Sequence, residues 1–84
     1  MADIKSVTVT IAGQDYVLKG DNSGNYLMSL AHDIDCRIRD IKLQNPNYTT
    51  SKASTLLAIQ LQDEINRIRE DYDKLIGELH RLRL

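Results

Sequence analysis

Residues 7–19 read VTVTIAGQDYVLK. In the first five, β-branched apolar residues alternate with threonine, which predicts a strand whose apolar side chains at 7, 9 and 11 share a buried face. Residues 12–15 are expected to form the turn, because Gly13 accepts a positive φ without steric cost. A second strand then covers residues 16–19, with Tyr16 expected in the core. Two strands alone are unstable in water, so the hairpin needs a helix or another subunit against it.

An amphipathic helix is predicted after the hairpin. Residues 21–24, Asp-Asn-Ser-Gly, hold three candidate N-cap residues, so the helix should begin near Ser23 or Gly24. The helix should end at Asn45-Pro46, since the residue before a proline avoids the α region. Apolar residues recur between these limits at helical spacing and predict one buried stripe, which consists of Leu27, Leu30, Ala31, Ile34, Ile38 and Ile41.

A second, much longer helix is predicted for the rest of the chain. Residues 49–51, Thr-Thr-Ser, offer new N-caps, and only Gly77 disfavours a helix from Lys52 onward, by about 1 kcal/mol. Such a helix, of about 34 residues, would be roughly 50 Å long. The hairpin and the first helix are too short to cover it, so its C-terminal part is expected to meet another chain.

The apolar residues of this long helix predict a coiled coil. From Ala58 to Leu82 they are spaced 3, 4, 3, 4, 3, 4 and 3, which is a heptad seam. Acidic and basic residues flank the seam at spacings that suit a parallel partner, but Asp71 faces no base in that arrangement, so an antiparallel one stays open. Ile76 widens the apolar strip and favours more than two helices. The residues predicted to mediate oligomerisation are Leu57, Ala58, Leu61, Ile65, Ile68, Tyr72, Leu75, Leu79 and Leu82.

Together these elements predict an α+β fold with an N-terminal two-stranded hairpin, one amphipathic helix and a long C-terminal helix that ends in a coiled coil. Residues 1–60 are expected to form a small head. Residues 61–84 are expected to form a coiled-coil extension continuous with the second helix. A head in a chain of 84 residues buries little surface by itself, and no disulfide staples it because Cys36 is the single cysteine. Oligomerisation is therefore the expected source of further core.

Charge and composition exclude several classes of partner. The formal net charge is −1 and no segment is strongly basic, which argues against nucleic acid. No run approaches the roughly 18 apolar residues of a membrane span, so no membrane insertion is expected. The first residues lack the long apolar run of a signal peptide, which favours a cytoplasmic protein with a free thiol.

The sequence contains few residues that could bind a metal ion or catalyse a reaction. His32 and Cys36 lie four residues apart on one helix face and could both touch a metal ion, with Asp35 as the best-placed third ligand. This pair lies on a polar face, where two solvated side chains are the simpler interpretation. No base accompanies the thiol, and no glycine-rich loop precedes Lys-Ser or Lys-Thr. We therefore expect no enzyme, no bound metal and no cofactor.

Three segments in order resemble the ZapA family of bacterial cell-division proteins. The hairpin pattern Val7-x-Val9-x-Ile11-x-Gly13-x-x-Tyr16 resembles the family's opening. Residues 34–41, IDCRIRDI, and the following Asn-Pro are similar to its first helix, and residues 57–65, LAIQLQDEI, to its Ala/Leu-rich block. The resemblance covers nearly the whole chain, and the length is like that of the short Gram-positive type. The family often has Asn at the position of Gln60.

The resemblance implies a non-enzymatic crosslinker. Family members form dimers through their heads, and two dimers join through the long helices into a tetramer. The heads contact FtsZ, the tubulin-like division GTPase, and align its protofilaments in the Z-ring at mid-cell. Exposed polar and basic residues of the head suit an acidic filament. The residues predicted to touch FtsZ are Gln14, Asp15, Arg37, Arg39, Lys42, Ser51 and Lys52.

Two other function classes stay open on the sequence. A generic coiled-coil adaptor for another intracellular partner would need the seam but not the head motifs. A small dimeric DNA-binding or antitoxin-like protein would need a basic stripe, which the near-neutral charge does not supply.

Overall fold

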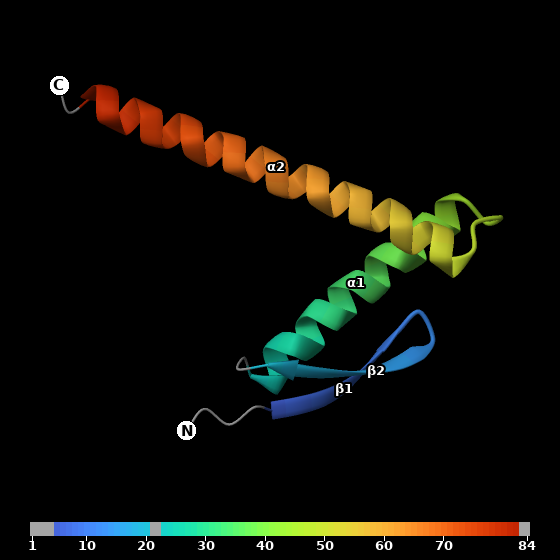
Figure 1. Ribbon diagram of the computed structural model, residues 1–84. Helices are drawn as coiled ribbons and strands as arrows, with labels where there is room; N and C mark the ends of the chain where they lie inside the picture. Colours follow the sequence, from blue (N-terminus) through green and yellow to red (C-terminus); the bar gives the residue numbers. More distant parts are fainter. Residues whose placement is uncertain (1–4, 21–22, 83–84) are drawn as a thin grey trace. The chain divides into compact units, whose positions relative to one another are not determined.

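The computed structural model describes residues 5–20 and 23–82. The expected α+β architecture of a hairpin, a helix and a long helix is confirmed (Figure 1). The elements in chain order are β1 (Lys5–Ile11), β2 (Gln14–Gly20), α1 (Gly24–Gln44) and α2 (Thr50–Leu82).

The chain divides into two compact units, Met1–Ser54 and Thr55–Leu84. The first unit contains the hairpin, α1 and the beginning of α2. The second contains the remainder of α2.

The hairpin has a shorter turn than the sequence pattern predicts. β1 and β2 are antiparallel, and Ile11 pairs with Gln14 and Thr10 with Asp15. The turn is therefore Ala12-Gly13 alone, with φ values of 52° and 82°. Two consecutive positive φ values suit a two-residue hairpin turn, because its twist matches that of the flanking strands. The expectation that Gln14 and Asp15 belong to the turn is wrong, since the ladder continues to the turn's edge.

The turn predicts opposite effects for two substitutions. Ala12 holds a left-handed backbone that costs a non-glycine residue about 1–2 kcal/mol. Ala12→Asn should raise the free energy of unfolding by about 0.5–1 kcal/mol, because Asn-Gly is the preferred pair for this turn. Gly13→Ala should lower it by about 1 kcal/mol, since a Cβ there is strained although space is open. Urea denaturation checks both values. Equal stability of the two variants would contradict the turn geometry.

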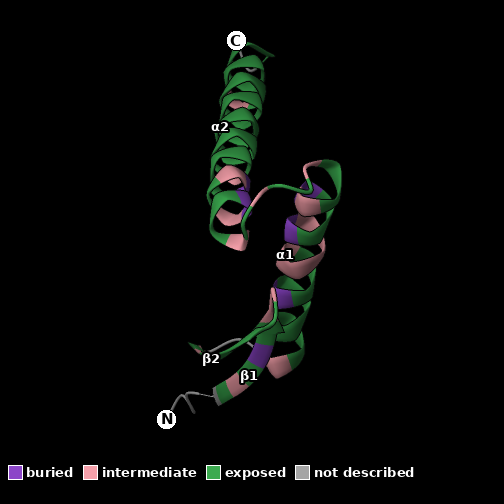
Figure 2. Ribbon diagram, turned by 90° about the vertical axis from the view of Figure 1, so that its right-hand side faces the viewer, coloured by how far each residue is buried: buried purple, intermediate pink, exposed green. Residues whose placement is uncertain are grey.

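The core of the first unit lies between β1 and one face of α1, which pack against each other. Figure 2 shows buried positions on β1, along α1 and at the start of α2. The buried apolar residues of the unit are Val9, Leu27, Ala31, Ile38, Ile41 and Ala53. Most of the predicted stripe is thus confirmed as core.

Two residues expected in the core are exposed. Leu30, at the edge of the apolar stripe, is 39% exposed, so the buried face of α1 is narrower than the stripe. Tyr16 is 45% exposed, because it stands on β2 while α1 packs on β1. Its hydroxyl donates a hydrogen bond to Oε1 of Gln14 at 2.9 Å.

Local capping sets the helix limits that the sequence predicts. Ser23 caps α1, and its Oγ accepts the N–H of Tyr26 at 3.2 Å. Asn45, before the proline, is the C-cap of α1. At the start of α2, Oγ1 of Thr49 accepts the N–H of Lys52 at 3.1 Å. Over the described ranges, no helix is apolar for long enough to cross a bilayer.

Candidate functional site

Two surfaces carry the predicted interaction residues. The first is the seam, defined here as the heptad residues of α2 from position 58 to position 82. From Ile65 onward, the large apolar side chains of the seam are between 43% and 82% exposed. They are Ile65, Ile68, Tyr72, Leu75, Leu79 and Leu82.

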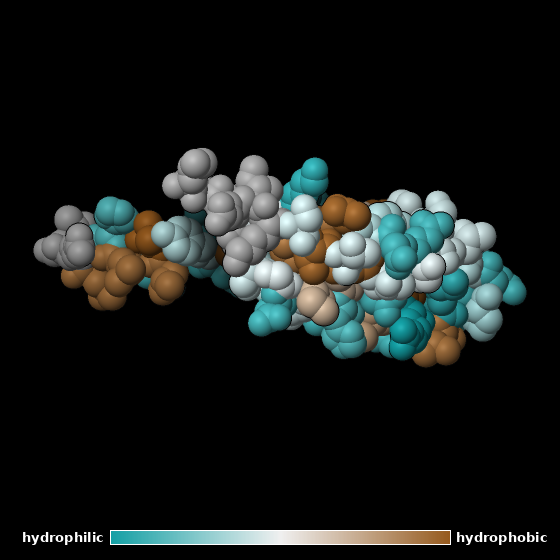
Figure 3. All heavy atoms as spheres, turned by 90° about the horizontal axis from the view of Figure 1, so that it is seen from below, coloured by the Kyte–Doolittle hydropathy of each residue, from teal (hydrophilic) through white to brown (hydrophobic). Residues whose placement is uncertain are grey.

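The seam runs along a helix whose remaining surface is mostly polar, although Ile59 outside the seam is also exposed. Hydrophobic side chains gather near the C-terminal end of α2 (Figure 3). On the polar side, Asp63 and Arg67 form an ion pair, with Nε 3.0 Å from Oδ2. Both partners are largely exposed, so this ion pair supports the helix only weakly. The row of exposed large apolar side chains is more informative about function than this ion pair, because such a row favours association with another helix.

At the seam's N-terminal end, and at Leu57 just before it, the burial changes. Leu57 is buried and Leu61 is half-buried, whereas Ala58 is exposed. These three predicted oligomerisation residues therefore differ in how much surface they offer to a second chain.

The second surface is the head surface, defined as the seven residues predicted to touch FtsZ. On the hairpin, Gln14 and Asp15 are exposed, as expected. Both side chains are held by short hydrogen bonds within the hairpin. Oε1 of Gln14 accepts from Tyr16, and Oδ1 of Asp15 accepts from the hydroxyl of Thr10 at 2.6 Å. The hairpin end is therefore an ordered polar element.

On α1, the three basic residues of the head surface differ in exposure and in partners. Arg39 is exposed, and its Nη2 lies 2.9 Å from Oδ2 of Asp35. Arg37 is half-buried, and residues two apart on a helix do not share a face. Lys42 is also half-buried and donates from Nζ to Oγ1 of Thr50 at 2.9 Å. Arg39 is thus the most available of the three cations.

At the start of α2, Ser51 and Lys52 are exposed. Nζ of Lys52 lies 4.5 Å from the ring centroid of Tyr48, a cation–π contact. An open pocket of about 290 Å³ has both Gln14 and Ser51 among its lining residues. The fold therefore brings the hairpin end and the start of α2, which are far apart in sequence, to one place.

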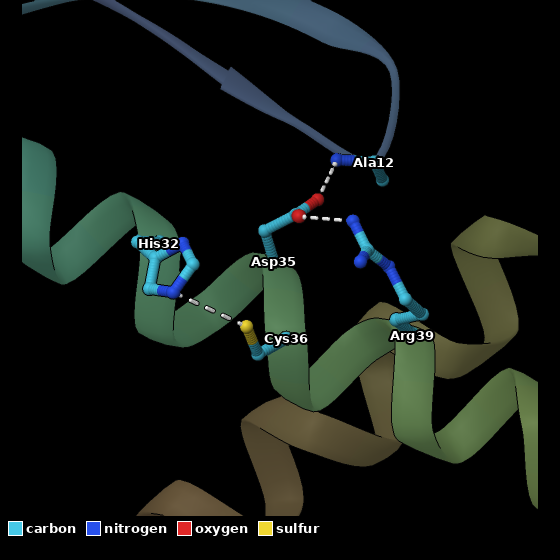
Figure 4. A network of polar contacts seen from close by, with 5 residues as sticks. All are labelled: Ala12, His32, Asp35, Cys36 and Arg39. Atoms are coloured by element: carbon cyan, nitrogen blue, oxygen red, sulfur yellow. Dashed lines mark hydrogen bonds and ion pairs between the residues drawn. The ribbon is translucent and has the colours of Figure 1, made fainter.

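Among the described residues, the candidate metal pair has no third ligand. Sγ of Cys36 lies 3.6 Å from Nε2 of His32, so the two side chains meet as their spacing predicts. The two oxygens of Asp35 are engaged elsewhere, one with the N–H of Ala12 and one with Arg39 (Figure 4). In the part of the chain that is described, no three His, Cys, Asp or Glu side chains gather as a metal site.

Sequence reasoning missed the role of Asp35. It considered this residue only as a metal ligand, whereas the structure places its carboxylate between the hairpin turn and Arg39. The available signal was its position, since Asp35 directly follows Ile34 of the apolar stripe and so lies beside the face that packs on the hairpin.

A hairpin-and-helix head followed by a long helix with an exposed heptad seam defines a small α+β protein with an exposed apolar helix surface. Comparison with known proteins gives the family. The profile of "Cell division protein ZapA" matches residues 7–83. The chain belongs to the ZapA family, and the resemblance of its motifs is confirmed.

Relatives and a solved structure agree with this assignment. The chain is 35% identical to the cell division protein ZapA of Geobacillus sp. (strain WCH70), over 89% of this chain and 86% of the relative. It is 32% identical to the ZapA of Halalkalibacterium halodurans, over 75% of this chain and 69% of that one. Its fold is similar to a ZapA mutant dimer from Geobacillus stearothermophilus, with a TM-score of 0.73, 27% identity and coverage of 92% and 90%.

Proposed function

We propose that this protein crosslinks FtsZ protofilaments and so stabilises the Z-ring. Membership of a cell-division family supports a Z-ring-associated role for the chain. The proposal adds a partner, FtsZ filaments, and a mode of action, bundling by an oligomer at the division site in the cytoplasm. No catalytic step is part of it.

The observation that carries the proposal is the exposed seam of α2. In a monomer these large apolar side chains are in contact with water. Burying them against another chain would stabilise the assembly by about 25 cal/mol for each Å² of apolar surface buried. The similar solved structure is a ZapA mutant dimer from Geobacillus stearothermophilus, which supports self-association. We infer a homodimer through the heads and a homotetramer through the seam.

An assembly of this kind explains how weak contacts could bundle filaments. Each copy carries one head surface, so a tetramer carries four. Once one head is bound, the next contact takes place at a high effective concentration, and the overall affinity rises without any new type of contact. The exposed cations of the head surface, Arg39 and Lys52, suit an acidic filament.

Co-pelleting with GTP-assembled FtsZ, with light scattering on the same samples, tests the function. A crosslinker should enter the pellet and increase the scattering, and both effects should weaken as salt is added, since exposed charges are screened. Folded, oligomeric protein that stays in the supernatant at low salt would contradict the proposal. The generic coiled-coil adaptor would then become the leading account.

A further inference from the structure

The hairpin and α1 are joined by a polar link as well as by their apolar core. Oδ1 of Asp35 accepts a hydrogen bond from the backbone N–H of Ala12 at 2.8 Å, across 23 positions of sequence. Oδ2 of the same carboxylate lies 2.9 Å from Nη2 of Arg39. Figure 4 shows the carboxylate between the turn and the guanidinium. The side chain of Asp35 therefore binds both the backbone of the hairpin turn and the guanidinium of Arg39.

The link meets the hairpin at its most restricted residue. Ala12 has a φ of 52°, which non-glycine residues rarely adopt. A carboxylate that accepts a backbone N–H makes a short, charge-assisted hydrogen bond, and this one is partly buried. Asp35 thereby fixes the turn over α1 at the point where β1 ends, and the two exposed polar residues of the hairpin end follow after Gly13.

We propose that Asp35 is a positioning residue of the head surface. It fixes the hairpin end and the Arg39 guanidinium relative to each other, so that a filament meets both in one arrangement. Binding to a preformed arrangement avoids the entropy cost of ordering it. This inference rests on the proposed function, because it assigns a role within the surface that is proposed to touch FtsZ.

The link itself is tested without FtsZ, by amide hydrogen exchange and ¹⁵N NMR of Ala12. Asp35→Ala removes the acceptor and should speed exchange at Ala12. Asp35→Asn keeps an oxygen acceptor and should leave this exchange slow while it frees Arg39. Asp33→Ala, which removes an exposed carboxylate from the same helix, is the matched control and should change neither. Unchanged exchange in Asp35→Ala would overturn the link.

Filament co-pelleting at a temperature at which circular dichroism shows every variant to be folded tests the positioning role. Asp35→Ala should weaken binding roughly tenfold, because the filament would then have to order the hairpin end and the guanidinium as it binds. Asp35→Asn should fall between it and the wild type, and Asp33→Ala should bind normally. In an Arg39→Ala background the effect of Asp35→Ala should shrink, because the two residues act as one unit.

A control variant distinguishes a positioning role of Asp35 from a general effect on the stability of the fold. Val7→Ala reduces the apolar face of β1 without touching the carboxylate. If Val7→Ala weakens binding as much as Asp35→Ala, Asp35 only stabilises the fold and the inference is wrong. Tight binding by Asp35→Ala with fast exchange at Ala12 would also overturn it, while leaving the proposed function in place. Failure of the wild type to pellet would instead remove the proposed function itself.

Discussion

Replacing Leu75 and Leu79 together with glutamate is expected to reduce the tetramer to a dimer. Both side chains lie on the seam, where they are 56% and 50% exposed in the single chain. In a tetramer formed through the seam they would be buried, and each new carboxylate would be an unpaired buried charge that costs roughly several kcal/mol. Sedimentation equilibrium or light scattering after gel filtration measures the mass.

The control for this double variant adds the same charge outside the seam. Asn66→Glu with His80→Glu places two carboxylates at exposed positions of the same helix, on its outer side in the heptad register. This variant should remain a tetramer. Circular dichroism should show equal helix content in both variants. A tetrameric mass for the Leu75→Glu/Leu79→Glu protein would show that the seam does not hold the assembly together.

Reversing the charge of Arg39 and Lys52 together is expected to abolish FtsZ filament binding while the oligomer persists. Both residues are exposed, so neither substitution creates a cavity. Each reversal turns an attraction to an acidic filament into a repulsion, and multivalency multiplies the loss over every head of the oligomer. Lys52→Glu also places an acid in the first turn of α2, where the helix dipole favours it. Co-pelleting measures the loss, and mass measurement confirms the oligomer.

A matched reversal on α2 provides the comparison. Arg67 pairs with Asp63 four residues earlier, just as Arg39 pairs with Asp35. Arg67→Glu with Lys74→Glu therefore makes the same change of charge and breaks a similar ion pair, but in the second unit of the chain. This protein should still pellet with filaments. If the Arg39→Glu/Lys52→Glu variant pellets equally well, these two cations are not part of the filament contact.

The head surface shows where sequence reasoning reached its limit. The exposure of Gln14, Asp15, Ser51 and Lys52 was predicted from polarity and is found. The half-buried state of Arg37 and Lys42 was not predicted, because a charged residue near the edge of an apolar stripe can lie against a neighbour or point to water. Lys42 donates a hydrogen bond to Thr50 at the start of α2. This contact depends on the conformation of the loop between α1 and α2.

The sequence by itself determined the order of the elements and the limits of the helices. Alternation over residues 7–11, capping residues at Ser23 and Thr49, the stop before Pro46 and the heptad spacing of α2 are all local signals, which act between residues close in the chain. Only the tertiary structure decided that the hairpin turn is two residues long, that Leu30 and Tyr16 are exposed, and that Asp35 holds the N–H of Ala12. The exposure of a side chain depends on which part of one element packs on another. A contact between residues 23 positions apart cannot be predicted from a local sequence pattern.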